Sequence, residues 1–176
     1  KLGARPIASF DEGTAEAEVA ANLYPSVRDA LLSAHAWSFA TAQLRLPRLE
    51  APPVADFGEA YQLPADFLRA ISAGTASRGR GLRYRIIDQR LHTSSNEVFL
   101  TYVFRPAETD FPPFFDQLLM ARMAAEFCIP ITESTSRAEM LYRVAEAEFR
   151  RARLIDAQQD TPTALEDFPL VEVRGQ

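Results

Sequence analysis

Few side chains in this sequence are of the types that carry acid–base, nucleophilic or metal chemistry. The 176 residues include two histidines, His35 and His92, and a single cysteine, Cys128. Neither histidine has a Cys, His, Asp or Glu companion at a spacing typical of a metal site. The sequence therefore predicts neither a metal site nor a bound cofactor.

The other reactive groups have structural explanations. His35 is expected at the end of a helix, where an imidazole interacts favourably with the helix dipole. Cys128 follows an apolar run, which is typical of a buried and inert thiol. Glu146 and Glu148 are explained as solvated charges on a helix, and Gly79-Arg80-Gly81 lacks the strand, helix and lysine of a phosphate-binding loop. We therefore expect no catalytic residues and no enzyme activity.

Arginines are concentrated between residues 78 and 90. Charge and stacking would allow such a segment to bind phosphate or single-stranded nucleic acid. The alternative is that the arginines pair with acidic residues of another subunit. The net charge of -5 and the single aromatic residue among them, Tyr84, argue against a dedicated nucleic-acid-binding protein. The candidate contact residues are Arg78, Arg80, Arg83 and Arg85.

Length and composition are typical of a globular protein with one main domain and room for an inserted subdomain. The chain is long enough to form a hydrophobic core, and its contents of 47% hydrophobic and 24% charged residues are ordinary. A single cysteine excludes an intramolecular disulfide, which fits a chain made in a reducing cytoplasm. No segment is apolar over the length that a membrane-spanning helix needs, so we expect no membrane partner.

The densest apolar run, residues 111–132, predicts the central helix of the fold. Two prolines open it at positions that suit a first helical turn. Only a narrow polar strip interrupts it, and a helix that is apolar nearly all round is typically buried. The strip consists of Asp116, Gln117, Arg122 and Glu126.

Helical periodicity continues on both sides of this run. Thr14 predicts the start of one helix, after which apolar residues recur every three or four positions. Pro25 lies inside this pattern and should kink the helix or split it in two. Ser136 with Glu139 has the pattern of a capping box and predicts the start of another helix, which extends to about Gln158.

Between residues 45 and 105 the period shifts from that of a helix towards that of a strand. Residues 45–58 contain three prolines and predict an irregular linker. The segment from Gly74 to Gly81 is expected to be a mobile, exposed loop. Short apolar segments separated by turn signals predict five strands of a small antiparallel sheet or sandwich, at residues 60–63, 67–72, 82–88, 90–93 and 98–104.

Together these elements predict an α+β fold. Residues 1–44 and 106–160 form an antiparallel helical bundle, residues 45–105 an inserted β subdomain, and residues 161–176 an extended C-terminal arm. The arm combines prolines and negative charge with apolar residues, as do segments that become ordered on a partner. The alternative is a terminal strand or arm packed on its own domain. The apolar residues of the arm are Leu165, Phe168, Leu170, Val171 and Val173.

Several short segments carry a resemblance when they are taken in order. One is YQLPADFLR at 61–69, and another is a hydrophobic helix that ends in IPIT at 129–132 and is followed by a long Glu/Arg-rich helix. Along nearly its whole length the chain resembles tail tubular protein A of short-tailed phages and related head-to-tail adaptors. The N-terminal part of the pattern is Leu2-Gly3, Pro6-Ile7, Ser9–Glu12, Leu23–Pro25, Arg28-Asp29, and Trp37 with Phe39.

This resemblance implies a virion structural protein at the head–tail junction, assembled in the cytoplasm of a host bacterium. Such adaptors occur in phages, prophages and gene-transfer particles. They form a homo-oligomeric ring, typically a dodecamer, between the portal protein and a tail or stopper protein. Double-stranded DNA passes through the ring without specific binding, and the family has no catalytic residues.

The resemblance also implies roles for two parts of the chain. In related adaptors the C-terminal tail docks on the portal, so the apolar residues between Leu165 and Val173 become the candidate portal contacts. Part of the apolar surface of the 111–132 helix, or of the faces beside it, is expected to be covered by the next subunit. The alternative function is a nucleic-acid-binding or regulatory module that uses the arginines of residues 78–90.

Overall fold

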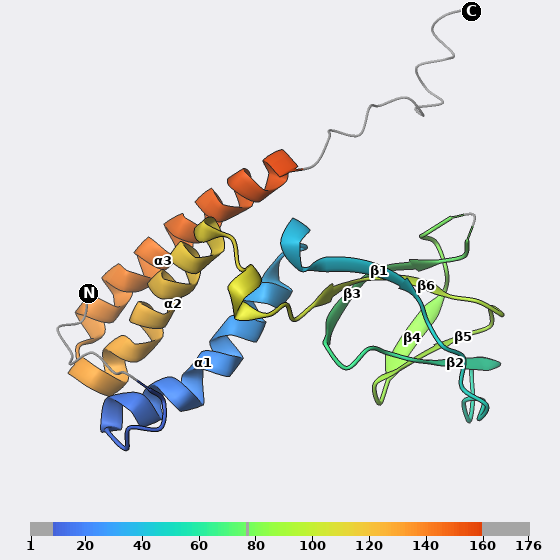
Figure 1. The fold of residues 1–176 in the computed structure, drawn as a ribbon, viewed down its shortest axis with the longest axis horizontal. Coiled ribbons are helices and arrows are strands. Elements are labelled where there is room, and N and C mark those ends of the chain that lie inside the picture. Colours follow the sequence, from blue (N-terminus) through green and yellow to red (C-terminus); the bar gives the residue numbers. More distant parts are fainter. Residues whose placement is uncertain (1–8, 77, 160–176) are drawn as a thin grey trace, which may run out of the picture.

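The apolar run at residues 111–132 forms a helix, α2 (Pro113–Thr132), on which the other two long helices pack. This computed structural model of the protein describes residues 9–76 and 78–159. Helix α2 lies between α1 (Ala15–Ala34) and α3 (Thr135–Asp156), as Figure 1 shows. The predicted central position is confirmed, but Met120 and Ile129 of α2 remain about half exposed, so its apolar surface is not covered on every side.

Helix α1 begins where the sequence predicts but does not divide at its proline. The Thr14 hydroxyl accepts the backbone N–H of Ala17 at 3.2 Å, which confirms the predicted N-cap. The helix continues through Pro25 as a single element, so of the two predicted alternatives, a kink or a split, the split does not occur. Both Pro25 and Ala21, whose carbonyl loses its partner, are exposed, so water can solvate that carbonyl while the opposite face packs on α2.

The capping box predicted at Ser136 is also wrong, because α3 starts earlier. The N-cap is Ser134, whose hydroxyl accepts the backbone N–H of Arg137 at 3.4 Å. Glu133 adopts a left-handed conformation with φ of 54°, and its N–H bonds to the carbonyl of Ile129. This residue reverses the chain directly after α2, so only two residues separate the helices of an antiparallel hairpin.

Six strands form two three-stranded antiparallel sheets at the other end of the molecule (Figure 1). One sheet has the order β1-β6-β3 and the other the order β2-β5-β4. The five predicted strands are all present, and the predicted α+β fold class is confirmed. The strands are β1 (Thr41–Arg45), β2 (Glu59–Gln62), β3 (Phe67–Gly74), β4 (Tyr84–Ile87), β5 (Arg90–Thr93) and β6 (Phe99–Phe104).

Strand β1 was not predicted, because the sequence assigned residues up to 44 to the helical bundle. The short η1 helix (Ser38–Ala40) follows α1 and directs the chain along β6, where Thr41 pairs with Val103 and Arg45 with Phe99. The segment has only one strongly apolar residue, Leu44, and its pairing with β6 rather than its own pattern makes it a strand.

Two turns in the β part depend on unusual backbone conformations. Asp88 and Gln89 both have positive φ and join β4 to β5 in a two-residue hairpin. Gly74 ends β3 at a tight turn closed by mutual hydrogen bonds between Thr75 and Arg78. A Cβ atom at Gly74 would overlap with the carbonyl oxygen of Arg78, so this position requires glycine.

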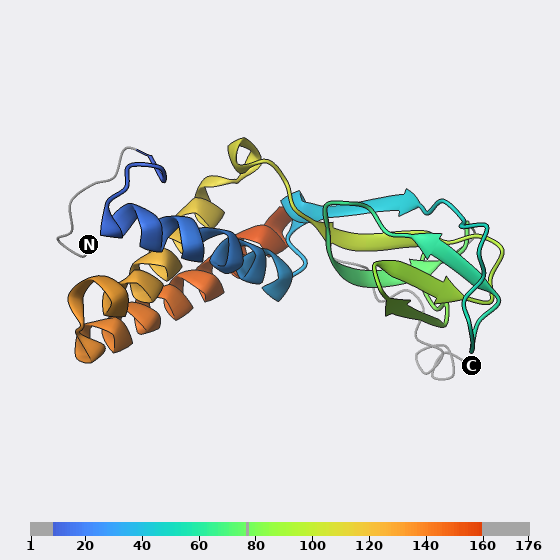
Figure 2. The same cartoon turned by 90° about the horizontal axis from the view of Figure 1, so that it is seen from below.

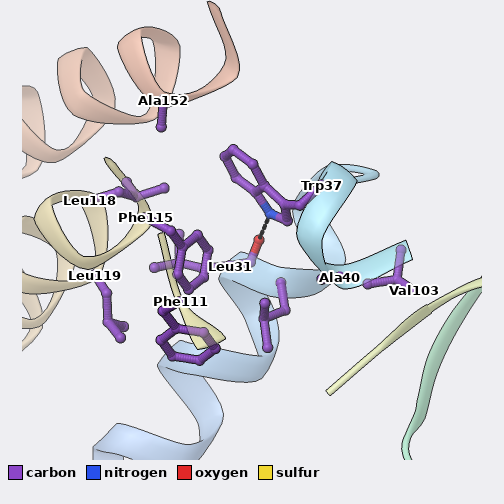
Figure 3. Packing of buried hydrophobic residues seen from close by; sticks show 10 residues of the cluster. Leu31, Trp37, Ala40, Val103, Phe111, Phe115, Leu118, Leu119 and Ala152 are labelled. Atoms are coloured by element: carbon purple, nitrogen blue, oxygen red, sulfur yellow. Dashed lines mark hydrogen bonds between the residues drawn. The ribbon is translucent and has the colours of Figure 1, made fainter. Parts of the chain in front are cut away.

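The molecule has two main cores, and β6 contributes to both of them. Its Leu100 and Tyr102 point into a core between the two sheets, whereas Val103 belongs to the core of the helical part. Trp37 is fully buried in the helical core and donates its indole N–H to the carbonyl of Leu31 at 2.9 Å (Figure 3). Trp37 thus anchors the end of α1 to the helical core, and Phe39 packs beside it.

Candidate interaction surfaces

A serine, a histidine and an aspartate meet where α3 ends, in a combination that invites comparison with a catalytic triad. The Ser38 hydroxyl donates to Oδ1 of Asp156 at 2.6 Å, and Nε2 of His35 lies 3.6 Å from Oδ2 of Asp156. A nucleophilic serine must transfer its proton to the histidine. Here both residues contact the carboxylate instead, so the trio does not have the geometry of acyl transfer.

The Asp156 carboxylate joins α3 to the chain that leads into the sheets. It is 4% exposed and accepts the backbone N–H of Ser38 at 3.1 Å to each oxygen, besides the Ser38 hydroxyl. Because Ser38 is the first residue of η1, the negative charge lies at the start of this short helix. Ser38 and Asp156 are 118 positions apart, so no local spacing in the sequence could have indicated this joint.

His35 is the C-cap residue of α1, and its ring packs edge-on against Trp37 with the ring centroids 4.8 Å apart. Burial lowers the pKa of His35 below its ordinary value of 6.5, and Arg153 lowers it further, which outweighs the opposing effect of Asp156. The imidazole is therefore neutral near pH 7. Its contact with Asp156 is not an ion pair, and the charge–dipole interaction suggested by the sequence does not operate at that pH.

A second polar joint connects α1 to the end of β6. The Arg105 guanidinium donates to both carboxylate oxygens of Asp29, at 2.6 Å from Nη2 and 3.0 Å from Nε. Arg28 also donates to Asp29 and reaches Glu108 at 3.2 Å in η2 (Glu108–Asp110). Burial alone would raise the pKa of Asp29, but the hydrogen bonds from Arg105 and Arg28 outweigh it and hold the pKa below its ordinary value.

Two of the four candidate arginines contact a loop of their own chain. The Arg83 guanidinium lies 5.9 Å from the centre of the Phe57 ring, and Nη1 of Arg85 donates to Asp56 at 2.8 Å. Both contacts join β4 and the residue before it to the irregular segment that precedes β2. Because both side chains remain exposed, each contact is weak and leaves the residue accessible.

The aromatic residue among these arginines does not lie with them on the surface. Tyr84 packs against the core between the sheets, whereas Arg78 and Arg80 are exposed on the preceding loop. A stacking site for single-stranded nucleic acid needs an accessible aromatic face beside the positive charge, and Tyr84 does not supply one. The geometry therefore favours contacts based on charge alone, and the identity of the group they contact stays a prediction.

Cys128 and His92 are not gathered into a reactive site. Cys128 is fully buried, as predicted, and its Sγ lies 3.4 Å from the hydroxyl of Thr132. His92 lies in β5, opposite Ala60 and Arg85 of the neighbouring strands. Within residues 9–76 and 78–159, no group of three or more His, Cys, Asp and Glu side chains is placed to hold a metal ion.

The predicted portal contacts fall in the C-terminal segment beyond the described residues, so their placement is not part of the structure. The described chain ends in a short helix, η3 (Ala157–Gln159), directly after α3 and beside the joint at Asp156. Those predicted contacts are Leu165, Phe168, Leu170, Val171 and Val173.

The outer side of α3 carries an exposed apolar row, which we call the α3 ridge and define as Met140, Val144, Ala147 and Leu154. The side chains of Met140, Val144 and Leu154 are 59%, 42% and 69% exposed. The four ridge residues, Ala147 included, follow one another at spacings of four, three and seven residues, which places them on one side of the helix. The buried residues of α3, including Leu141 and Ala145, face α2 from the other side. The ridge is therefore a helix face without a partner in the described chain.

Sequence reasoning missed the ridge although its signal is present. Leu141, Ala145 and the other apolar residues that pack on α2 recur every three or four positions and form one buried or half-buried face. A second apolar row at heptad spacing runs along the same segment, with Arg151 at its remaining position. Two apolar rows on one helix indicate two packing partners.

A groove of about 530 Å³ lies between α1 and α3, with α2 as its floor. The α1 wall includes Val27, Ala30 and Ala34, and the α3 wall includes Ala145 and Phe149. The groove is lined mainly by apolar residues, and it lies where a four-helix bundle would place a further helix beside the three of the described chain. Its charged lining residues are Arg122, Glu126 and Glu146.

Comparison with known proteins identifies no family for this chain. No protein-family model matches it, and no curated protein matches it at a significant level. Among the described residues, no helix combines the length and the apolar character needed to cross a membrane.

Proposed function

We propose that this protein is a head-to-tail adaptor of a phage, prophage or gene-transfer particle. In this role it assembles as a ring between a portal protein and a tail or stopper protein. DNA passes through the ring without specific binding. The protein acts through its surfaces, and it carries out no catalytic step.

The observation that carries the proposal is the exposed α3 ridge. Three large apolar side chains in heptad register, each more than 40% exposed, are the pattern of a helix that completes its packing on another molecule. The groove between α1 and α3 is a second apolar surface on the same helical part. These surfaces agree with the order of segments that resembles the adaptor family.

The alternative of a nucleic-acid-binding module receives less support. Arg83 and Arg85 contact Phe57 and Asp56 of their own chain, and Tyr84 faces the core. Net charge is negative, so a strong attraction to phosphate would have to arise from a local patch alone.

The test is assembly with the portal protein encoded in the same genome. We expect the full chain and the portal to form a joint ring that is visible by negative-stain microscopy. Deletion of residues 162–176 should abolish portal binding, and a Gly/Ser segment of equal length should not restore it. The melting temperature of the deletion variant should stay close to that of the full chain. A full chain that stays monomeric with its portal would contradict the proposal.

A further inference from the structure

The α3 ridge and the groove are different surfaces on the same helical part. Leu141 and Ala145 of α3 face α2, Phe149 lines the groove next to them, and the ridge is on the side of α3 that points away from α2. One copy can therefore present its ridge while its groove receives another helix. Two distinct and complementary surfaces are what a head-to-tail contact requires, and such contacts form rings when the rotation closes.

The charges beside the two surfaces are complementary. By helical periodicity, four arginines and one glutamate flank the ridge or lie in it: Arg137, Arg143, Arg150, Arg151 and Glu148. The groove carries two glutamates and one arginine, and that arginine, Arg122, is already paired with Glu126 at 2.8 Å. The exposed Glu146 carboxylate makes no ion pair within the described residues, and Arg150 of the same copy donates only to the backbone carbonyl of Glu146, at 3.4 Å.

We infer that α3 of one copy lies in the groove between α1 and α3 of the next copy. There it takes the place of a fourth helix, with the ridge against Ala30, Phe149 and the α2 floor. The arginines beside the ridge approach Glu146 of the receiving copy. This inference rests on the proposed ring and specifies which surfaces build it.

The first test uses two methionines with nearly equal exposure. Met140 in the ridge is 59% exposed, and Met120 on α2, outside both surfaces, is 57% exposed. We expect Met140→Glu to raise the dissociation constant of the assembly at least tenfold, because it places a carboxylate against the glutamates of the groove. Met120→Glu should leave it unchanged. Mass photometry over a concentration series measures both, and thermal unfolding followed by circular dichroism checks that both variants fold.

The second test locates the contact by cross-linking. Ala30→Cys combined with Val144→Cys should give a ladder of covalent multimers under mild oxidation. The unmodified chain, whose Cys128 is fully buried, should give none. Val144→Cys alone should remain uncross-linked, and a covalent dimer of this variant would overturn the inference because it would show two ridges packed on each other.

The outcomes separate this inference from the proposed function. An assembly with the portal that forms normally and tolerates Met140→Glu would overturn the ridge-in-groove contact and leave the adaptor role standing. A covalent ladder from a chain that never joins a portal would support the contact and contradict the adaptor role. A double cysteine variant that assembles but does not cross-link would overturn the contact.

Discussion

The helical part and the β part of this molecule bury their apolar residues in different ways. In the β part, residues from both sheets close over one core that includes Tyr61, Leu91 and Leu100. In the helical part, the rings around Trp37 form a dense core, yet the α3 ridge and the groove beside α2 remain open. The β part covers its core and leaves apolar side chains such as Val54, Ile86 and Ile87 exposed. The helical part leaves an exposed apolar row along α3 and an apolar groove between α1 and α3.

The largest effect on stability is expected from the centre of the helical core. Trp37 is fully buried, its ring centroid lies 5.4 Å from that of Phe115 and 5.9 Å from that of Phe149, and its N–H is hydrogen-bonded. Trp37→Ala should lower the free energy of unfolding by about 3–5 kcal/mol, measured by urea denaturation. Trp37→Phe should cost less because it keeps an aromatic ring. A loss below 1 kcal/mol for Trp37→Ala would contradict the central role of this residue.

The matching change in the β part tests whether the two parts unfold together. Leu91 is fully buried between the sheets, and Leu91→Ala should lower the free energy of unfolding by about 2–5 kcal/mol. Because the two parts share β6, we expect one cooperative transition that both variants shift in the same way. Two separate transitions, each moved by one variant only, would show that the parts are independent folding units.

A smaller effect is expected at the joint between α3 and η1. Asp156→Asn keeps the shape of the side chain but removes the charge that accepts the N–H and hydroxyl of Ser38. Hydrogen bonds to a buried charged group contribute about 1.5–3 kcal/mol, and the variant should lose an amount in that range. Ser38→Ala keeps the backbone hydrogen bond and should lose less. Equal losses of unfolding free energy for both variants would show that the hydrogen bond from the Ser38 hydroxyl accounts for the whole contribution of this joint.

The two joints should respond to acid over different pH ranges. The pKa of His35 in the folded chain is lowered below 6.5. On acidification the unfolded chain therefore binds a proton at His35 at a higher pH than the folded chain does, and stability should fall as pH drops below 6.5. The pKa of Asp29 is lowered below 3.8, so its contribution is complete above pH 3.8 and is lost as pH falls below that value. Urea denaturation between pH 8 and pH 3 measures both effects. His35→Gln should remove the first decline and leave the second.

The parts of the fold that could be predicted from the sequence are those with a local cause. Strand β5, at Arg90–Thr93, has its predicted bounds because a turn precedes it and Ser94-Ser95-Asn96 follows it. Thr14 starts its helix because its hydroxyl caps a nearby N–H. By contrast, β1 is a strand because β6 lies beside it, and the early start of α3 depends on the left-handed Glu133.

The candidate surfaces also differ in whether a local signal in the sequence could predict them. The α3 ridge has a local signal in the heptad spacing of Met140, Val144 and Leu154, and a search for a second apolar row would have found it. The groove has no such signal, because it combines residues of three helices that meet only in the folded chain. The four candidate arginines are all exposed, but the contacts of Arg83 with Phe57 and of Arg85 with Asp56 depend on how an irregular loop folds.

The pairing of Thr41 with Val103 has a consequence for how this protein could have been assembled in evolution. These residues begin β1 and nearly end β6, and they are partners in an antiparallel ladder, where opposite Cα atoms lie about 4.5–5.5 Å apart. The chain between these two residues leaves the helical part and returns to almost the same point. Figure 2 shows this for the connection from α1 into β1 and the connection from β6 towards α2. A gene segment that encodes the chain between them could therefore be exchanged for one of different length in a single event, with both ends kept where they join the helices.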